Sequence, residues 1–229
     1  GLNEYGLAPY KMVDDFAQKE VSFVLSIGGI EVRNNQRLGR DFTLESLKKG
    51  YDAVFMGVGL GTVNALKIPG EELHGVIDAV EKIAEIRQAT DLSLVQIGRK
   101  VVVVGGGNTA VDIAIQAKRL GAESVTLVYR RGEEHMGATQ HERELARLSG
   151  VLIRTWARPT AIQGAAGAAS SMGFEATELR DGKLVGTGKM FTLETDQVFK
   201  AIGQKLVPDA LSGLDVVNGK IAVNEQFQT

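Results

Sequence analysis

The sequence predicts an α/β fold with a parallel sheet, and three observations support this. Residues 100–104 form a nearly uniform β-branched run, which is typical of a strand buried on both faces of a parallel sheet. A helical pattern over residues 108–120 and a second strand over 124–129 complete a strand–helix–strand unit. Glycine accounts for 28 of the 229 residues, so we expect many tight turns or backbone segments that a ligand approaches closely.

The part of the chain before this unit alternates helices and strands. Polar and apolar residues over 10–20 favour a helix, and the apolar run 21–27 favours a strand that ends at two glycines. Thr43 is expected to cap a short helix, and residues 51–58 are expected to form a buried strand that ends in a glycine loop. Pro69 and the glycine after it interrupt the chain, and we expect a domain boundary near them.

The part after the unit favours further sheet structure. A charged helix is expected over residues 139–148 and a strand over 151–155. We interpret the small-residue stretch 164–171 as a loop between strands, and an Asp-Gly pair at 181 and 182 predicts a hairpin. A final strand is expected to end at Gly203.

Composition argues against several classes of partner. The chain has 26 Lys and Arg residues against 28 Asp and Glu, a net charge of −2, so no overall field favours nucleic acid or acidic membrane. No apolar stretch is long enough to span a bilayer, and we expect a soluble, cytoplasmic protein. The chain has no cysteine, which excludes thiolate-held metal or iron–sulfur sites within it. It opens at Gly1 without an initiator methionine, and we expect it to start within a longer protein.

A six-residue glycine motif directly follows the first strand of the unit and opens its helix. It matches the pattern G-x-G-x-x-A of Rossmann-like dinucleotide-binding domains in the required structural context. Its residues are Gly105, Gly106, Gly107, Asn108, Thr109 and Ala110. The alternative interpretation is a glycine turn between strand and helix that binds no ligand.

Each position of this motif has a physical task in dinucleotide binding. Gly105 would make the tight turn, Gly107 would let a pyrophosphate approach the backbone, and Ala110 would let the helix pack closely on the strand. Asn108 or Thr109 would cap the helix or donate to a phosphate oxygen. Asp112, in the first turns, would complement the helix dipole. The helix N-terminus is therefore predicted to hold the pyrophosphate.

The end of the second strand bears on the choice between the two nicotinamide cofactors. A ribose 2′-hydroxyl calls for a carboxylate there, whereas a 2′-phosphate calls for arginine. The strand ends in Arg130 and Arg131, which favours NADPH over NADH. The alternative is a solvated basic strand end that pairs with Glu133 or Glu134, and these two carboxylates keep NADH possible.

Other candidate residues carry less information. His74, His135 and His141 do not share a metal-ligand spacing, so we predict surface histidines and no metal site. Trp156 is expected in the core or at a domain contact. We expect no catalytic side chain, because hydride transfer is carried by the cofactors themselves.

Five motifs in order resemble the glutamate synthase small subunit and the related flavin part of dihydropyrimidine dehydrogenase. The resemblance covers essentially the whole chain. The motifs are Gly-Leu-Asn-Glu-Tyr-Gly-Leu-Ala at 1–8, the run 51–59 followed by Ile-Pro-Gly at 68–70, the motif 105–110 with Asp112, Val-Tyr-Arg-Arg at 128–131, and the run 196–204.

The resemblance implies an NADPH-binding domain, residues 76–203, inserted in an FAD-binding domain that residues 1–75 and 204–229 represent incompletely. It also implies that hydride passes from NADPH to FAD, and that electrons leave for iron–sulfur clusters and a catalytic partner subunit or domain. Gly57 and Gly59 on one side, and Gly203 on the other, would lie at the two crossings between these domains.

Some of the family's elements are not in the sequence. The FAD-binding fingerprint would precede Gly1, the closing element that reaches the flavin would follow Thr229, and the cluster cysteines are missing. We therefore expect the chain to bind the pyridine nucleotide, to hold FAD poorly and to lack full turnover alone. The alternative is a non-catalytic Rossmann-like module that docks to a partner subunit. A dithiol–disulfide reductase would need paired cysteines, which this chain lacks.

Overall fold

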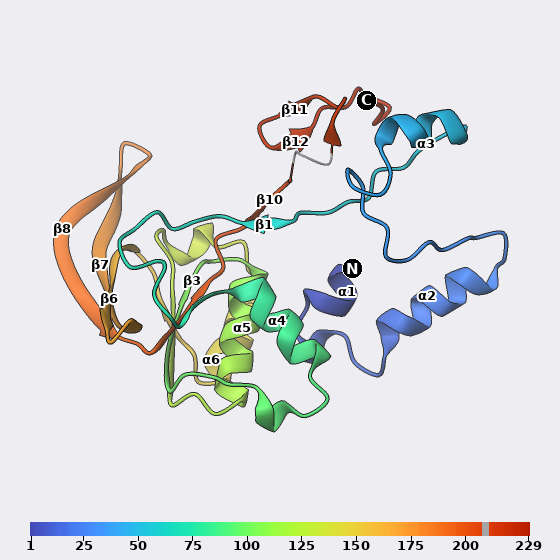
Figure 1. Ribbon diagram of the computed structural model, residues 1–229. Helices are drawn as coiled ribbons and strands as arrows, with labels where there is room; N and C mark the ends of the chain where they lie inside the picture. Colours follow the sequence, from blue (N-terminus) through green and yellow to red (C-terminus); the bar gives the residue numbers. More distant parts are fainter. Residues whose placement is uncertain (208–210) are drawn as a thin grey trace. The chain divides into compact units, whose positions relative to one another are not determined.

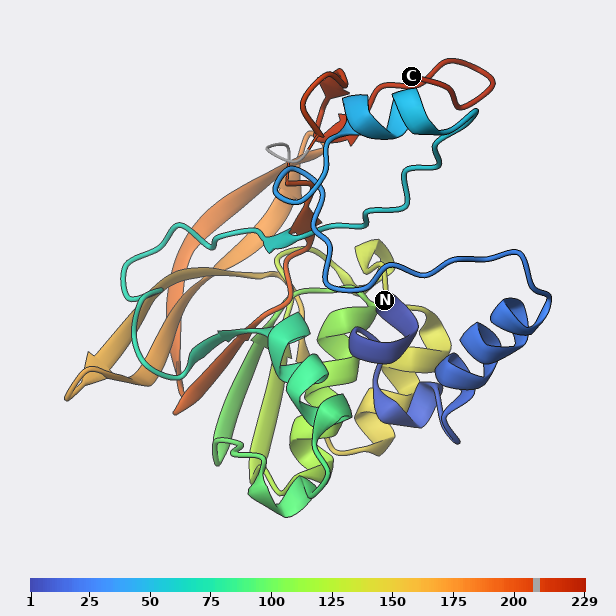
Figure 2. The same cartoon turned by 45° about the vertical axis from the view of Figure 1, so that its right-hand side comes forward.

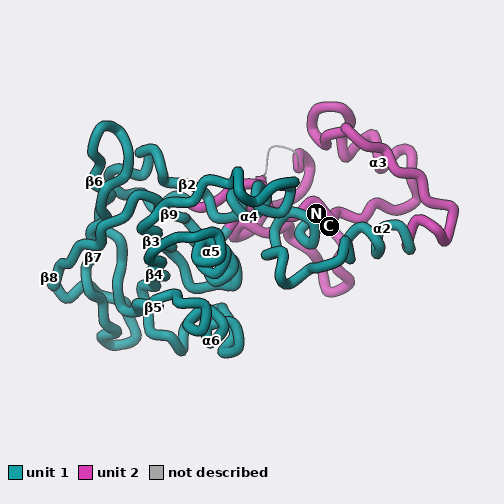
Figure 3. Tube along the Cα trace, turned by 90° about the horizontal axis from the view of Figure 1, so that it is seen from below, with its two compact units in different colours: residues 1–23, 65–203 teal, residues 24–64, 204–229 magenta. Residues whose placement is uncertain are grey.

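The computed structural model describes residues 1–207 and 211–229, and the chain divides into two compact units (Figure 3). Unit 1 comprises residues 1–23 and 65–203, and unit 2 comprises residues 24–64 and 204–229. The segment 1–75 is therefore shared between the two units. Its assignment to an FAD-binding domain stays a prediction, as does that of 204–229, of which residues 208–210 lie outside the description.

Within the described residues, the centre of unit 1 is a five-stranded parallel sheet with the order β2-β9-β3-β4-β5, which Figure 3 labels and Figures 1 and 2 show as ribbons. Its strands are β2 (Val76–Asp78), β3 (Lys100–Val104), β4 (Ser124–Val128), β5 (Leu152–Arg154) and β9 (Gln197–Lys200). The central strand β3 pairs with β4 from Lys100 opposite Ser124 to Val104 opposite Val128. The strand–helix–strand unit that the sequence predicts is therefore confirmed.

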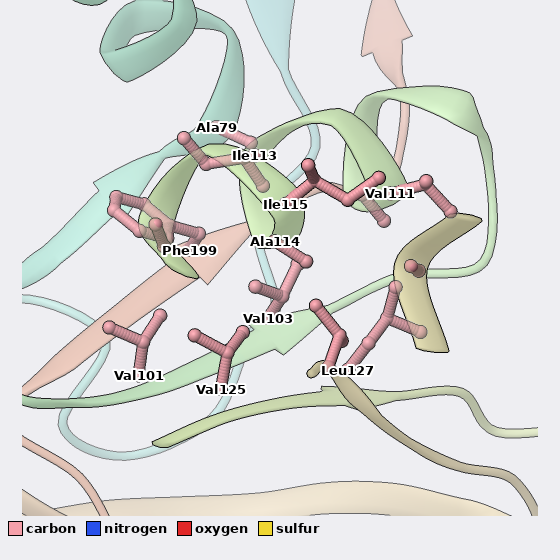
Figure 4. Packing of buried hydrophobic residues seen from close by; sticks show 14 of the residues in the cluster. Ala79, Val101, Val103, Val111, Ile113, Ala114, Ile115, Val125, Leu127 and Phe199 are labelled. Carbon is pink, nitrogen blue, oxygen red and sulfur yellow. The ribbon is translucent and has the colours of Figure 1, made fainter. Parts of the chain in front are cut away.

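Helices cover one face of this sheet. They are α4 (Ala79–Gln88), α5 (Asn108–Arg119) and α6 (Gln140–Leu148) (Figure 2). The charged helix predicted over 139–148 is confirmed as α6, and Thr139 caps it. Alternate strand residues point toward α5, because successive side chains of a strand lie on opposite faces (Figure 4). The labelled residues of this core are Ala79, Val101, Val103, Val111, Ile113, Ala114, Ile115, Val125, Leu127 and Phe199.

A three-stranded antiparallel sheet supplies a second core on the opposite side. Its strands are β6 (Ala157–Ala165), β7 (Ala168–Arg180) and β8 (Lys183–Glu194). Val102 and Val104 of β3 pack in this core with the fully buried Met172 and Phe174 of β7. The predicted hairpin is confirmed, since Asp181 and Gly182 both have positive φ between paired strands, as a two-residue I′ turn requires.

The remaining elements are short. Unit 1 also contains α1 (Leu2–Tyr5) and the 3₁₀ turns Pro9–Lys11, Leu92–Leu94 and Glu133–His135, while α2 (Phe16–Ser26) spans the first division between units. The described part of unit 2 contains α3 (Leu44–Gly50), β1 (Thr62–Val63), β10 (Gln204–Lys205), β11 (Val216–Val217) and β12 (Lys220–Ile221). In unit 2, β1 pairs with β10 and β11 with β12. No helix among the described residues is long and apolar enough to cross a membrane.

Two predicted strands are wrong. Residues 21–27 lie mainly in α2, and residues 51–58 form no strand in the structure. Both runs are apolar, yet Phe23 is 71% exposed and Phe55 is 95% exposed. A strand forms where a second strand pairs with it, and no strand of the described residues pairs with either run. Composition alone therefore favoured strands that the pairing does not support.

The segment 8–11 of unit 1 is held by one buried carboxylate of α5. Asp112 is 1% exposed, and its Oδ2 accepts a hydrogen bond from the Ala8 N–H at 3.2 Å. Its Oδ1 accepts from the Tyr10 hydroxyl at 3.0 Å and lies 2.6 Å from the Lys11 Nζ. The carboxylate that was expected to complement the helix dipole is thus engaged with a segment about a hundred residues earlier in the chain.

Further contacts strengthen this anchor. The Lys11 Nζ also lies 2.5 Å from the Glu142 Oε1 of α6, and the Arg119 guanidinium stacks 4.4 Å from the centre of the Tyr10 ring. Burial lowers the pKa of Lys11, but the hydrogen bonds to Asp112 and Glu142 outweigh burial and raise it. Burial and the neighbouring Asp112 both raise the pKa of Tyr10. Lys11 therefore stays charged and Tyr10 stays a neutral hydrogen-bond donor.

Replacing this carboxylate tests its structural role. Asp112→Ala should lower the free energy of unfolding by about 3 kcal/mol, because it removes one of the two counter-charges of the partly buried Lys11 and the acceptor of the Ala8 N–H and the Tyr10 hydroxyl. Glu144→Ala, which removes an exposed carboxylate of α6, should change it by less than about 0.5 kcal/mol. Urea denaturation of both variants measures the difference. Equal stability of the two variants would show that Asp112 does not anchor the segment.

Candidate nucleotide-binding site

The glycine loop, residues 105–107, connects β3 to α5, and packing within the protein requires its first two glycines. A Cβ on Gly105 would lie 2.3 Å from the carbonyl oxygen of Ala201, and the Gly105 N–H donates to the Val128 carbonyl at 3.0 Å. A Cβ on Gly106 would lie 2.5 Å from the ring of Tyr129. Any side chain at these two positions would displace the turn from the sheet.

Gly107 differs from its two neighbours. It has an ordinary φ of −98°, and no atom lies within 4 Å of the place where its Cβ would stand. It is the N-cap residue of α5 and is half-buried. The packing of the chain therefore gives no reason for a glycine here, whereas the approach of a ligand to the backbone would give one.

Backbone N–H groups at the glycine loop and the start of α5 lack acceptors within the described residues. Among the described residues, no hydrogen-bond acceptor is found for the N–H groups of Gly106, Gly107, Asn108 and Thr109. Neither Asn108 nor Thr109 caps α5 through its side chain, so that alternative for these residues is not formed. Ala110 is fully buried against the sheet, as the motif predicts. The N-terminus of α5 thus keeps its free donors and its partial positive charge.

Two arginines lie at the neighbouring strand end. Arg130 and Arg131 follow β4, whose carboxyl end is at the same sheet edge as that of β3, because the two strands are parallel and in register. Arg130 is exposed and Arg131 is half-buried. In the part of the chain that the structure describes, neither guanidinium forms an ion pair.

The carboxylates that were considered as partners for these arginines are engaged elsewhere. Glu133 lies 3.1 Å from Arg143 and also pairs with Arg147, and these contacts lower its pKa, Arg147 above all. Glu134 pairs with His135 at 3.0 Å. The alternative in which Glu133 or Glu134 neutralises the basic strand end is therefore not formed.

The stretch 132–138 is held against the glycine loop. The Tyr129 hydroxyl donates to the His135 carbonyl at 2.9 Å, and the Ala138 N–H donates to the Gly106 carbonyl at 3.0 Å. The Trp156 N–H donates to the Arg131 carbonyl at 3.1 Å, and its ring meets that of His135 edge to face, with centres 6.3 Å apart. The sequence alone assigned neither aromatic residue to this site, because their proximity depends on the pairing of β4 with β5.

The other predicted site residues lie near the divisions between the units. Gly57 and Gly59 belong to unit 2, in the irregular stretch between α3 and β1. Gly203 is the last residue of unit 1 and has a φ of +89°, a conformation that favours glycine. Their role at domain crossings stays a prediction. Among the described residues no group of three or more potential metal ligands is found. The contacts of the site within the described part of the chain do not include His74 or His141.

Comparison with known proteins assigns a family to this geometry. The family model of the pyridine nucleotide-disulphide oxidoreductases matches residues 7–229. The chain belongs to this family. The α/β architecture with its parallel sheet confirms the fold class predicted from the sequence.

Two curated relatives have names that describe a subunit or chain of a larger enzyme. The NADPH-Fe(3+) oxidoreductase subunit beta of Geobacter sulfurreducens is 31% identical over 243 residues, which cover 98% of this chain and 35% of that protein. The glutamate synthase [NADPH] small chain of Azospirillum brasilense is 29% identical over 218 residues, or 89% of this chain and 45% of that protein. The predicted resemblance to the glutamate synthase small subunit is confirmed. The chain spans less than half the length of either relative.

A solved structure of the same fold is FprA from Mycobacterium tuberculosis in complex with NADPH. It superimposes with a TM-score of 0.74 at 23% identity, covering 98% of this chain and 65% of that one. At this identity the likeness supports the fold alone. Membership of the oxidoreductase family rests on the family model and the curated relatives.

Alanine substitutions at Gly106 and Gly107 should show which of the two glycines the stability of the fold requires. Gly106→Ala should lower the free energy of unfolding by about 2 kcal/mol, because the added methyl group meets the anchored Tyr129 ring. Gly107→Ala should stay within about 1 kcal/mol of the original chain, since its Cβ enters open space. Thermal and urea denaturation provide the measurement. A large loss of stability in Gly107→Ala would show that this glycine serves the fold.

Proposed function

We propose that this chain binds NADPH and forms the pyridine-nucleotide-binding part of a flavin-dependent oxidoreductase. The observation that carries the proposal is the open space at Gly107, together with the N–H groups of residues 106–109, for which the described residues provide no acceptor. Those donors suit a pyrophosphate, since the helix N-terminus adds a partial positive charge. The required glycines and the buried Ala110 of the motif support the same interpretation.

The charge at the end of β4 supports NADPH over NADH. A 2′-phosphate is a dianion with several acceptor oxygens, and two guanidinium groups without carboxylate partners suit it. Arg130 and Arg131 provide these groups at the same sheet edge as the glycine loop. When bound, NADPH supplies a hydride. The residues of the chain bind and orient the adenosine diphosphate half of the dinucleotide, and no side chain is needed as an acid or base.

The wider role is part of the proposal. Relatives named as subunits of an NADPH-Fe(3+) oxidoreductase and of glutamate synthase support a route from NADPH to FAD and on to iron–sulfur clusters in a partner subunit or domain. A dihydropyrimidine dehydrogenase type of protein would use the same route. In this proposal Gly57, Gly59 and Gly203 lie where the chain crosses between the FAD-binding and NADPH-binding domains.

Calorimetric titration with the two nucleotides tests the cofactor. Arg130→Ala and Arg131→Ala should each weaken NADPH binding about tenfold and leave NADH binding nearly unchanged, because only NADPH carries the 2′-phosphate. Gly107→Ala should weaken both nucleotides. Arg180→Ala, which removes a guanidinium paired with Glu178 at the tip of the β7–β8 hairpin, is the control and should change neither affinity.

Three results would count against parts of this proposal. Equal losses for NADPH and NADH in the arginine variants would remove the 2′-phosphate assignment. No loss in Gly107→Ala would move the pyrophosphate away from the glycine loop. No binding of either nucleotide to the original chain would instead favour a non-catalytic module that docks to a partner subunit.

The flavin is tested separately. We expect the chain of residues 1–229 to hold FAD weakly and to lack NADPH-dependent reduction of an artificial acceptor, because the resemblance places the FAD fingerprint outside this sequence. Gel filtration after incubation with FAD, followed by the visible absorbance spectrum of the protein fraction, provides the measurement. A tight yellow complex with turnover would contradict the expectation.

A further inference from the structure

Trp156 has an unusual backbone conformation at the arginine-bearing edge of the sheet. Its φ of +58° lies in the left-handed region, which bulky residues rarely adopt. Three backbone hydrogen bonds impose it: Trp156 N–H to the Arg131 carbonyl, Ala157 N–H to the Tyr129 carbonyl, and Thr177 N–H to the Trp156 carbonyl at 2.9 Å. The conformation is thus fixed by the same strand end that carries Arg130 and Arg131.

The Trp156 side chain is not part of a buried core. Trp156 is half-buried and is a member of neither buried core of unit 1. Its described ring contact is the edge-to-face contact with His135, whose side chain is 38% exposed. The His135 backbone is in turn fixed by the Tyr129 hydroxyl. The backbones of both aromatic residues are therefore fixed beside the basic strand end, and both residues are partly exposed to solvent.

We propose that Trp156 and His135 form an aromatic platform that takes the adenine ring of the dinucleotide. This inference rests on the proposed function. The adenine and the 2′-phosphate are attached to the same ribose, so a phosphate held by Arg130 and Arg131 places the base within a few ångströms of this strand end. Every base has an apolar face, and aromatic side chains bind such faces by stacking.

A purely structural role would have different consequences. If Trp156 served only to fill space, its loss would lower stability and leave ligand affinity unchanged. A platform behaves in the opposite way: its loss lowers affinity for ligands that contain adenine and leaves the fold intact. The strained backbone at a half-exposed aromatic residue favours the platform, because strain of this kind persists where a side chain must be presented in a fixed place.

The experiment compares two substitutions with one ligand. Trp156→Asn removes the ring but tolerates the left-handed conformation, and Trp156→Phe keeps an aromatic face. Adenosine 2′,5′-bisphosphate serves as the probe, because it contains the adenine and the 2′-phosphate but no nicotinamide. We expect calorimetry to show about tenfold weaker binding of this probe and of NADPH to Trp156→Asn, but about threefold or less to Trp156→Phe. The melting temperatures should stay within about 3 °C of the original chain.

Fluorescence of the unmodified chain gives a second measurement that needs no variant. Trp156 is the only tryptophan of the sequence, so all indole emission comes from the proposed platform. The probe absorbs far below the wavelength of indole emission, and quenching by it therefore reports stacking rather than energy transfer. We expect saturable quenching with the same dissociation constant that calorimetry gives.

The outcomes distinguish this inference from the function on which it rests. If the original chain binds NADPH but shows no quenching, or if Trp156→Asn binds the probe as tightly as the original chain, the platform is overturned and the proposed function stands. If the original chain binds neither NADPH nor the probe, both are overturned.

Discussion

The structure of unit 1 depends on one constraint, the burial of β3 on both faces. Val101 and Val103 pack beneath the helices, while Val102 and Val104 pack against the antiparallel sheet of β6, β7 and β8. Water is thus excluded from both sides of the strand, and its backbone groups must be satisfied by β4 and β9. The turn after β3 begins with two glycines, because Ala201 leaves no room for a Cβ at Gly105 and Tyr129 leaves none at Gly106.

The same constraint creates the candidate site. A strand enclosed by two layers opens to solvent only at its ends, and the first turn of α5 begins where β3 emerges. The neighbouring strand β4 ends at the same edge and presents its two arginines there. The helix N-terminus and the two arginine residues thus lie at the same sheet edge because parallel strands end together, which is the general reason that ligands bind at the carboxyl edge of such sheets.

Local patterns in the sequence predicted the strand–helix–strand unit, the hairpin at Asp181 and the glycine motif, because each depends on neighbouring residues. They could not predict contacts that depend on distant pairing. The ion pair between Lys11 and Asp112 joins residues about a hundred positions apart in the sequence. The position of Trp156 depends on the pairing of β4 with β5. The strands predicted at residues 21–27 and 51–58 are wrong for a related reason, since an apolar run forms a strand only where another strand pairs with it, and this pairing cannot be seen in the local sequence.

The contacts of Asp112 also connect the segment 8–11 to the N-terminal part of α5. Asp112 lies four residues after Asn108, about one helical turn from the glycine loop. The helix α5, whose N-terminus is proposed to bind the nucleotide, is therefore also the helix that holds residues 8–11 through Asp112. A displacement of residues 8–11 would therefore act on α5 within about one turn of the N–H groups proposed to bind the pyrophosphate.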